Sequence, residues 1–252
     1  MSANGWPGVR VAAVADLHVR PAVAGRFRPH FAALAGAADL LLLAGDLTNA
    51  GTEQDVRLLC DELADLPVPG VAVLGNHDHD DGLGDRLAEM LTGLGVTVLD
   101  GTVGYWQVRG VRVGVAGVMG GGGGFPGGER AGYPDADRHG ERLRRGPVDA
   151  ARLRGALDGL DGEVRIALMH FAPTTDTLAG ERTEIYPGLG CHELGAVVDE
   201  AGVDLVVHGH AHAGTERGST AAGHPVRNVA HPVLGRPYAI YQLDDGQVRD
   251  VG

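Results

Sequence analysis

Three short apolar runs in the first third of the chain each end just before a polar residue. The runs cover residues 9–15, 40–44 and 71–74, and the polar residues are Asp16, Asp46 and Asn76. Short runs rich in Val, Leu and Ala, bounded by Gly or polar residues, are typical of buried strands. The polar residues recur every 30 positions (16, 46, 76), which suits a βαβ unit of roughly 30 residues or more. Right-handed crossovers return parallel strands side by side, so the three residues are predicted at one edge of a parallel sheet.

The rest of the chain continues the alternation of strands and helices. Helical spacing of apolar residues predicts helices over residues 26–37, 52–66, 83–94, 147–160 and 192–201. Further strands are predicted over residues 96–99, 105–108, 111–116, 164–169, 203–207, 226–229 and 238–243. Irregular segments are predicted over residues 117–128, 130–145 and 171–190. The first is nearly all Gly, but no Lys follows it, so it is not a phosphate-binding P-loop. We predict an α/β fold and, because no linker divides the chain, a single domain over residues 1–252.

Composition excludes several classes of function. The formal net charge is −12, whereas proteins that grip long nucleic acids usually present a basic face. All 21 basic residues are Arg, which excludes Schiff-base lysine chemistry. Two Cys are too few for a disulfide framework, and no segment approaches the roughly 20 apolar residues of a membrane span. There is no signal-peptide pattern at the N-terminus. We therefore expect a cytoplasmic protein that acts on neither nucleic acid nor membrane.

Histidines and carboxylates gather at the ends of the predicted strands. The complete set is Asp16, His18, Asp46, Asn76, His77, Asp78, His170, His208, His210 and His212. Taken singly, an Asp after a strand is ordinarily a turn former or helix cap, and a lone His is ordinarily a hydrogen-bonded structural residue. Taken together, this many unpaired polar groups on one rim would be costly unless they bound something.

The chemistry of this set favours two metal ions. Oxygen and imidazole donors without thiolate suit Mn, Fe, Zn or Co. The set exceeds what a single tetrahedral ion uses, so two ions that share a carboxylate fit better. Two ions roughly 3.5–4 Å apart are the usual arrangement for phosphate ester hydrolysis.

Five motif blocks together resemble the calcineurin-like metallophosphoesterases. They are Asp16-x-His18, Gly45-Asp46, Gly75-Asn76-His77-Asp78, His170 and Gly209-His210-Ala211-His212. The blocks occur in order over residues 16–212. The run Gly45-Asp46-Leu47-Thr48-x-x-Gly51 also resembles bacterial cyclic-nucleotide phosphodiesterases of this family. The resemblance implies a four-layer α/β/β/α sandwich of two mixed sheets flanked by helices, with a dinuclear metal site at the sheet ends.

The resemblance also assigns a role to each residue. It implies one ion held by Asp16, His18 and His212, a second held by Asn76, His170 and His210, and Asp46 as a bridge. His77 would protonate the leaving oxygen and Asp78 would orient it. His208 lies outside the family pattern and is interpreted as structural or as a neighbour of the ligands. We expect two divalent ions, with Mn or Fe favoured over Zn.

Charge and acid–base chemistry agree with these roles. Asp16 and Asp46 are the two anionic ligands, so two divalent ions would leave the site at about +2, which favours phosphate. A metal-bridging hydroxide would act as nucleophile. The imidazole of His77 is suited to donate a proton to a poor alkoxide leaving group.

Four functions remain open on the sequence alone. The favoured one is hydrolysis of a small-molecule phosphodiester, with a cyclic nucleotide as one candidate. The alternative is a phosphomonoesterase acting on a phosphoprotein or small metabolite. The charge and scarce aromatics (4%) count against a nuclease, and the complete motif set counts against an inactive scaffold. Loop residues near the motifs are interpreted as ordinary loop residues; they are Arg20, Phe125, Arg130, Tyr133, Phe171, Arg182 and Tyr186.

Overall fold

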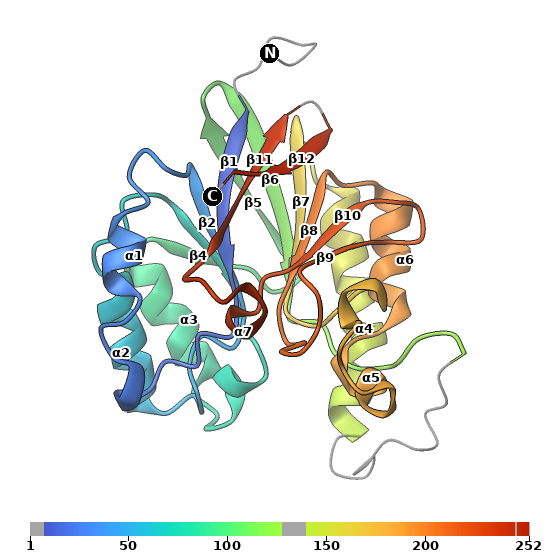
Figure 1. The fold of residues 1–252 in the computed structure, drawn as a ribbon, viewed down its shortest axis with the longest axis horizontal. Coiled ribbons are helices and arrows are strands. Elements are labelled where there is room, and N and C mark those ends of the chain that lie inside the picture. Colours follow the sequence, from blue (N-terminus) through green and yellow to red (C-terminus); the bar gives the residue numbers. More distant parts are fainter. Residues whose placement is uncertain (1–7, 128–139, 245, 252) are drawn as a thin grey trace.

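The protein is a sandwich of two six-stranded sheets with helices on both outer faces (Figure 1). The structure is a computed structural model that describes residues 8–127, 140–244 and 246–251. Helices of the first half of the chain cover one sheet, and the helices over 140–158 and 192–201 cover the other (Figure 1). The predicted four-layer α/β/β/α architecture is confirmed.

The order of strands shows how each half of the chain builds a sheet. The first sheet has the order β12 (Gln247–Asp250), β11 (Ala239–Asp244), β1 (Val9–Val14), β2 (Leu40–Ala44), β3 (Gly70–Val73) and β4 (Val96–Val98). The second has the order β5 (Thr102–Val108), β6 (Val111–Val118), β7 (Val164–Met169), β8 (Leu205–His208), β10 (Pro225–Asn228) and β9 (Arg217–Ser219). The helices are α1 (Arg28–Ala32), α2 (Glu53–Leu63), α3 (Gly84–Gly93), α4 (Gly140–Asp158), α5 (Tyr186–Leu189), α6 (His192–Ala201) and α7 (His231–Leu234).

The central strands of both sheets are parallel, which brings their carboxyl ends to the same edge. β1, β2 and β3 are adjacent parallel strands, with Val14 opposite Leu43 and Ala44 opposite Val73. This confirms the arrangement that the 30-residue spacing predicts. In the second sheet, β6, β7, β8 and β10 are likewise parallel. Antiparallel strands lie only at the margins of the two sheets, so each sheet is mixed.

Three apolar clusters fill the spaces between the four layers. The inner cluster packs one sheet on the other through residues such as Val11, Leu42 and Ile166. The other two pack the first sheet against its helices and the second sheet against α4 and α6. Most of the buried side chains are Val, Leu and Ala, in keeping with the scarcity of aromatic residues. At roughly 25 cal/mol per Å² of apolar area, this burial is the main force that holds the two sheets together.

Several predicted boundaries are wrong, and α1 shows why. The segment 26–37, predicted as one helix, is helical only over Arg28–Ala32, and 33–37 continue as turns. Phe27, Phe31, Leu34 and Ala38 are nevertheless buried, so the apolar pattern identifies the buried face. Gly36, with φ of 72°, closes the segment in a conformation that no helix can extend.

The segment before α4 is also corrected in part. The sequence predicts irregular structure over 130–145, but α4 already begins at Gly140 and runs through Pro147; residues 128–139 lie outside the described part. Arg and Leu in 142–145 are good helix formers, whereas Pro147 favours a helix that starts beside it. The sequence patterns do not reveal β9, β12 and α7. Short helical turns and α5 interrupt the loop predicted over 171–190.

Neither cysteine is cross-linked, and no described helix meets the length and hydropathy needed to cross a membrane.

Candidate metal centre

The residues that follow β1 and β2 adopt an unusual backbone conformation. Asp16 and Asp46 have φ of 56° and 49°, and His18 and His210 have φ of 44° and 68°. Among the described residues, Arg109 is the only other non-glycine with positive φ. Such residues typically cost about 1–3 kcal/mol each and persist where the surrounding structure enforces them, commonly at functional sites. Strain therefore concentrates on four residues that the sequence marks as ligands.

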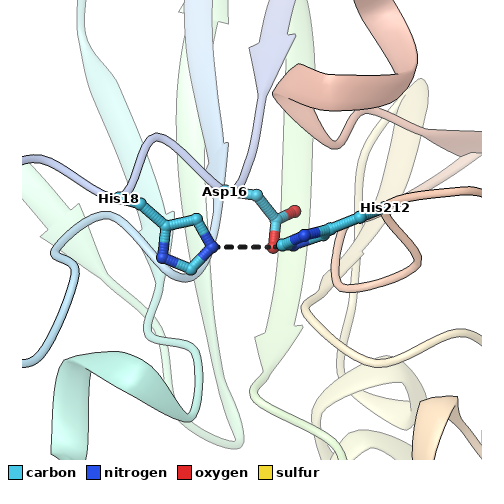
Figure 2. A group of neighbouring side chains, drawn as sticks. All are labelled: Asp16, His18 and His212. Carbon is cyan, nitrogen blue, oxygen red and sulfur yellow. Dashed lines mark hydrogen bonds and ion pairs between the residues drawn. The ribbon is translucent and has the colours of Figure 1, made fainter. Parts of the chain in front are cut away.

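The first group of ligands consists of Asp16, His18 and His212. Figure 2 shows His18 and His212 on opposite sides of the Asp16 carboxylate. The Nε2 atom of His212 lies 2.8 Å from Asp16 Oδ1, and the Nε2 atom of His18 lies 3.9 Å from the same oxygen. The potential ligand atoms of this group all lie within 4.8 Å of one another. The spacing is suitable for holding one cation.

The second group consists of Asp46, His170 and His210, and its potential ligand atoms also lie within 4.8 Å of one another. The Nε2 atom of His170 lies 3.3 Å from Asp46 Oδ2. Both rings are oriented by main-chain carbonyls: His170 Nδ1 lies 2.8 Å from the Ala44 oxygen, and His210 Nε2 lies 3.2 Å from the Gly188 oxygen. Such a bond leaves the other ring nitrogen available to a metal, as is usual for ligating histidines.

Asp46 connects the two groups. Its Oδ2 atom lies 4.0 Å from His18 Nε2 in the first group and 3.3 Å from His170 Nε2 in the second. Its Oδ1 atom accepts the His77 N–H at 2.8 Å, which holds the carboxylate in place. Asp46 is 1% exposed. The expected bridging residue therefore lies between the two groups.

Two polar atoms at the centre support occupation by cations. Asn76 Oδ1 and His18 Nε2 are buried and, within the described residues, have no hydrogen-bond partner. A buried acceptor without a partner costs about 1–3 kcal/mol. A cation in the first group would offer a partner to His18 Nε2, and a second cation could do the same for Asn76 Oδ1. The donor set of carboxylate, amide and imidazole groups thus fits two divalent ions.

The protonation of the histidines follows their surroundings. Burial lowers the pKa of His210 to about 3, and burial also lowers the pKa of His18, so both rings are neutral and can donate a lone pair. Burial disfavours the charged form of His170, but Asp46 outweighs it and raises the pKa of His170 to about 9. Burial likewise disfavours the Asp46 carboxylate, but the positive field of His170 lowers its pKa. The centre thus already favours positive charge beside Asp46.

Two glycines of the motifs lie where a side chain would displace ligands. A Cβ atom on Gly75 would lie 2.2 Å from Asp46 Oδ1, and one on Gly45 would lie 2.6 Å from His170 Nδ1. Gly45 also has φ of 85°. Close approach of strand ends to the ligands therefore requires Gly at both positions.

His77 lies at the rim of the centre, and its orientation differs from the expectation. Its Nδ1 atom lies 2.9 Å from Asp80 Oδ2, and its side chain is 41% exposed. Asp78, predicted to orient His77, is instead fully buried and bonds to other groups. Asp80 is not among the residues that the motifs mark, although its position three residues after His77, at the end of a helical turn, is a usable signal.

Asp78 holds two strand ends together. Its carboxylate accepts hydrogen bonds from the N–H groups of Leu47, Thr48 and Gly75 and from the Thr48 hydroxyl, at 2.7–3.2 Å. Burial, and then the charge of Asp46, raise the pKa of Asp78, whereas these bonds oppose that shift. Asp78 thereby ties the loop carrying Asp46 to the loop carrying Asn76.

The Asp78→Asn variant is expected to lose about 2–3 kcal/mol of stability. The amide nitrogen of the new side chain is a donor, so it cannot accept the hydrogen bonds that the surrounding N–H groups now give to the carboxylate. Thermal unfolding of the metal-free variant and the parent protein would measure this loss. Asp65→Asn, which changes an exposed carboxylate paired with Arg28, is the control and should stay within about 0.5 kcal/mol of the parent. A midpoint shift no larger than that of the control would contradict the role given to Asp78.

His208 is structural, in agreement with one of its two expected interpretations. It is completely buried, with Nε2 2.8 Å from Thr177 Oγ1 and Nδ1 2.8 Å from the Gly209 oxygen. Burial lowers the pKa of His208 to about 4, and a neutral ring satisfies both bonds. Its hydrogen bonds anchor the loop that presents His210.

The loop residues near the motifs have varied positions. Phe171 is buried and packs against the His210 ring, with ring centroids 4.2 Å apart. Arg20 bonds to Asn49 Oδ1 at 3.1 Å, close in the chain to His18. Phe125 and Tyr186 pack around a small apolar cluster that contains Ala211. Arg182 is exposed and directly precedes a helical turn. The remaining two loop residues, Arg130 and Tyr133, lie outside the described part.

Two adjacent Asp/His groups, each able to hold a cation, in a fold of two mixed sheets define the class as a metal-binding α/β protein. Comparison with known families gives the particular group: the model of the calcineurin-like phosphoesterases matches residues 9–214. The chain belongs to this family, whose members hydrolyse phosphoesters with two metal ions. No curated protein sequence matches the chain.

Solved structures share the fold at low sequence identity. Phosphopantetheinyl hydrolase from Mycobacterium tuberculosis is 18% identical, with a TM-score of 0.70 over 97% of this chain and 96% of that one. A hypothetical protein from Thermus thermophilus is 16% identical, with a TM-score of 0.56 over 97% and 96% of the two chains. At these identities, the likeness shows the shared fold.

Proposed function

We propose that the chain hydrolyses a small-molecule phosphodiester with two divalent metal ions and with His77 as the proton donor. The observation that carries the proposal is the pair of Asp/His groups that share Asp46. The geometry of the described residues and the family motifs that they match support the role proposed for each residue.

Each metal ligand has a proposed role. Asp16, His18 and His212 would hold one ion, Asn76, His170 and His210 would hold the other, and Asp46 would be shared between them. When bound, two such ions supply a nucleophile from water and neutralise the charge that builds on the phosphoryl oxygens. Oxygen and nitrogen donors without thiolate favour Mn or Fe, with Zn also compatible.

His77 and Asp80 supply the acid. The exposed edge of His77 can approach a leaving oxygen, and a carboxylate 2.9 Å from its Nδ1 fixes the orientation of the ring. His77 then gives its proton to the alkoxide as the ester bond to phosphorus breaks. Asp78 acts one step further away by holding the strand ends in register.

The net charge favours a diester. A diester carries one negative charge and a monoester about two, so a protein of net charge −12 repels the diester less at long range. The same charge disfavours polymeric nucleic acid. A phosphomonoesterase is the second candidate. Two cysteines without a disulfide are compatible with the cytoplasm that we propose.

Metal analysis combined with a substrate panel tests the proposal. Protein reconstituted separately with Mn, Fe and Zn is expected to bind two ions per chain and to hydrolyse bis-nitrophenyl phosphate at least about tenfold faster than nitrophenyl phosphate. Cyclic nucleotides would be assayed beside them. Chelator-treated protein should be inactive and should recover on reconstitution. Fewer than two ions per chain would contradict the metal assignment, and faster hydrolysis of the monoester would favour the second candidate.

A further inference from the structure

A small cavity lies beside the segment that carries Asn76 and His77. It has a volume of 110 Å³ and is lined by residues of α3, α4 and the end of β4. Leu74, in its wall, precedes the Gly75–Asn76 turn directly. Met119, also in its wall, accepts the His170 N–H at its carbonyl at 3.0 Å. The cavity is therefore built partly from the segments that position two of the metal ligands.

Arg145 reaches this cavity from α4 and is held by a buried carboxylate. Its Nε atom donates to Asp149 Oδ2 at 3.0 Å, and the Asp149 side chain is 2% exposed. Asp149 also accepts the Gly120 N–H at 3.0 Å and Arg152 Nη1 at 3.2 Å. The Asp149 carboxylate therefore holds both the Arg145 side chain and the start of the glycine-rich loop in place.

The terminal nitrogens of Arg145 are available to a ligand. A guanidinium has five N–H donors, and Asp149 engages only the Nε–H. Over the described ranges of the chain, the two Nη atoms have no protein hydrogen-bond partner, and the side chain is partly exposed where it lines the cavity. The guanidinium is planar, and Asp149 fixes its Nε atom. Its two Nη groups can therefore donate to a pair of neighbouring acceptor atoms on a ligand.

The other walls define what the cavity can accept. Leu74, Val98 and Leu99 supply apolar surface, and Asp85 and Asp100 supply acceptor oxygens. Asp100 is itself paired with Arg152 at 2.7 Å. The lining holds two carboxylates against Arg145 and the imidazole of His79, so the cavity carries no surplus positive charge. It disfavours a second anion and favours a neutral, flat group with both donors and acceptors.

We propose that this cavity binds the nucleobase of a nucleotide ester and that Arg145 is a specificity-determining residue that donates to acceptors on the base. The inference rests on the proposed function, because an organic group of a diester bound at the metal centre would extend toward a neighbouring wall, and Leu74 and His79 of this cavity flank the segment that carries Asn76 and His77. The volume equals about four water molecules at ~30 Å³ each, which suits a single ring system. Apolar faces would cover the ring, and Asp85 would accept from its amino group.

Two variants separate recognition from chemistry. Arg145→Lys keeps a positive charge beside Asp149 but removes the fork, and Arg145→Gln removes both. Asp149 keeps its Gly120 and Arg152 partners in each, so the fold should persist. Arg154→Gln, farther along α4 and paired with Glu200 at the surface, is the matched control. For each protein, kcat and KM would be measured for the nitrophenyl ester of a nucleoside 5′-phosphate and for methyl nitrophenyl phosphate.

The expected result is selective. Both Arg145 variants should lose roughly 10- to 100-fold in kcat/KM on the nucleotide ester, mainly through KM, because a hydrogen bond from a charged group is lost. Methyl nitrophenyl phosphate and the bound metal should change less than about twofold, and the control should match the parent on both esters. Equal losses on both esters, or no loss on either, would overturn the inference.

Binding without a phosphate distinguishes failure of the inference from failure of the proposed function. Guanosine is the probe, because its base presents two neighbouring acceptors, O6 and N7, to an arginine fork and an amino group to a carboxylate. Saturation-transfer NMR with guanosine should show contact at the base proton in the parent and the Arg154→Gln control, and much weaker contact in Arg145→Gln. If the parent hydrolyses neither ester but binds guanosine in this Arg145-dependent way, the cavity assignment stands and the phosphoesterase proposal fails. If guanosine binds equally well to Arg145→Gln, the cavity assignment fails whatever the hydrolysis shows.

Discussion

The Asp46→Ala variant is expected to bind fewer than two metal ions per chain and to lose phosphoesterase activity by on the order of 10³-fold or more. Asp46 lies between the two ligand groups, with its Oδ2 atom 4.0 Å from His18 Nε2 and 3.3 Å from His170 Nε2. Its removal takes a ligand from both groups at once and leaves fewer charges to compensate the cations. Metal content by mass spectrometry and hydrolysis of bis-nitrophenyl phosphate would measure the two effects.

Asp55→Ala is a suitable control for Asp46. Asp55 is also a buried carboxylate, and it accepts the Ala50 N–H at 3.2 Å at the start of α2, outside both ligand groups. The control should lose stability but retain two ions and near-parental activity when folded. If Asp46→Ala keeps both ions, Asp46 is not the shared ligand.

Replacement of His77 by Ala is expected to separate proton donation from metal binding. Esters with a poor alkoxide leaving group should be hydrolysed about 10²–10⁴-fold more slowly, because the leaving oxygen must then depart without a proton. Nitrophenyl esters should slow by less than about tenfold, because nitrophenolate leaves unprotonated. Metal content should not change, since His77 belongs to neither ligand group among the described residues.

Two companion variants sharpen the His77 test. His30→Ala changes an exposed histidine of α1 and should leave both classes of ester unaffected. Asp80→Asn should show the same selectivity as His77→Ala at smaller amplitude, because the ring stays and loses its charged partner. Similar losses on both classes of ester in His77→Ala would contradict its role as proton donor.

Much of the fold could be predicted because the strands are short, buried and equally spaced. The parallel order of β1, β2 and β3 followed from the positions of Asp16, Asp46 and Asn76, which crossover geometry must bring to one edge. The strands at the margins of the sheets were harder to predict from the sequence. β9 and β12 are short and partly exposed, so they lack the apolar run that marks the central strands.

The grouping of the ligands was predictable only through the family motifs. The spacing of the motifs in the sequence placed the ligands at one edge of the sheets. It could not show that His212 belongs to the same ligand group as Asp16, or that His170 belongs to the same group as Asp46. That pairing depends on how the second sheet docks on the first, which apolar patterns do not encode. The Asp78 contacts were missed for a similar reason, since its partners are mostly main-chain N–H groups. Backbone donors carry no sequence signal.

The ligands are spread over both halves of the chain, and this bears on how the protein is made. The N–H of His210 bonds to Asp16 Oδ2 at 2.9 Å, and His170 Nδ1 meets the Ala44 oxygen. Synthesis proceeds from the N-terminus, so a growing polypeptide on the ribosome carries Asp16 and Asp46 long before their partners emerge. Neither cation has a complete set of ligands until the later histidines have left the exit tunnel. Such a nascent chain could not cleave cellular esters prematurely, and hydrolytic competence would coincide with the final joining of the halves.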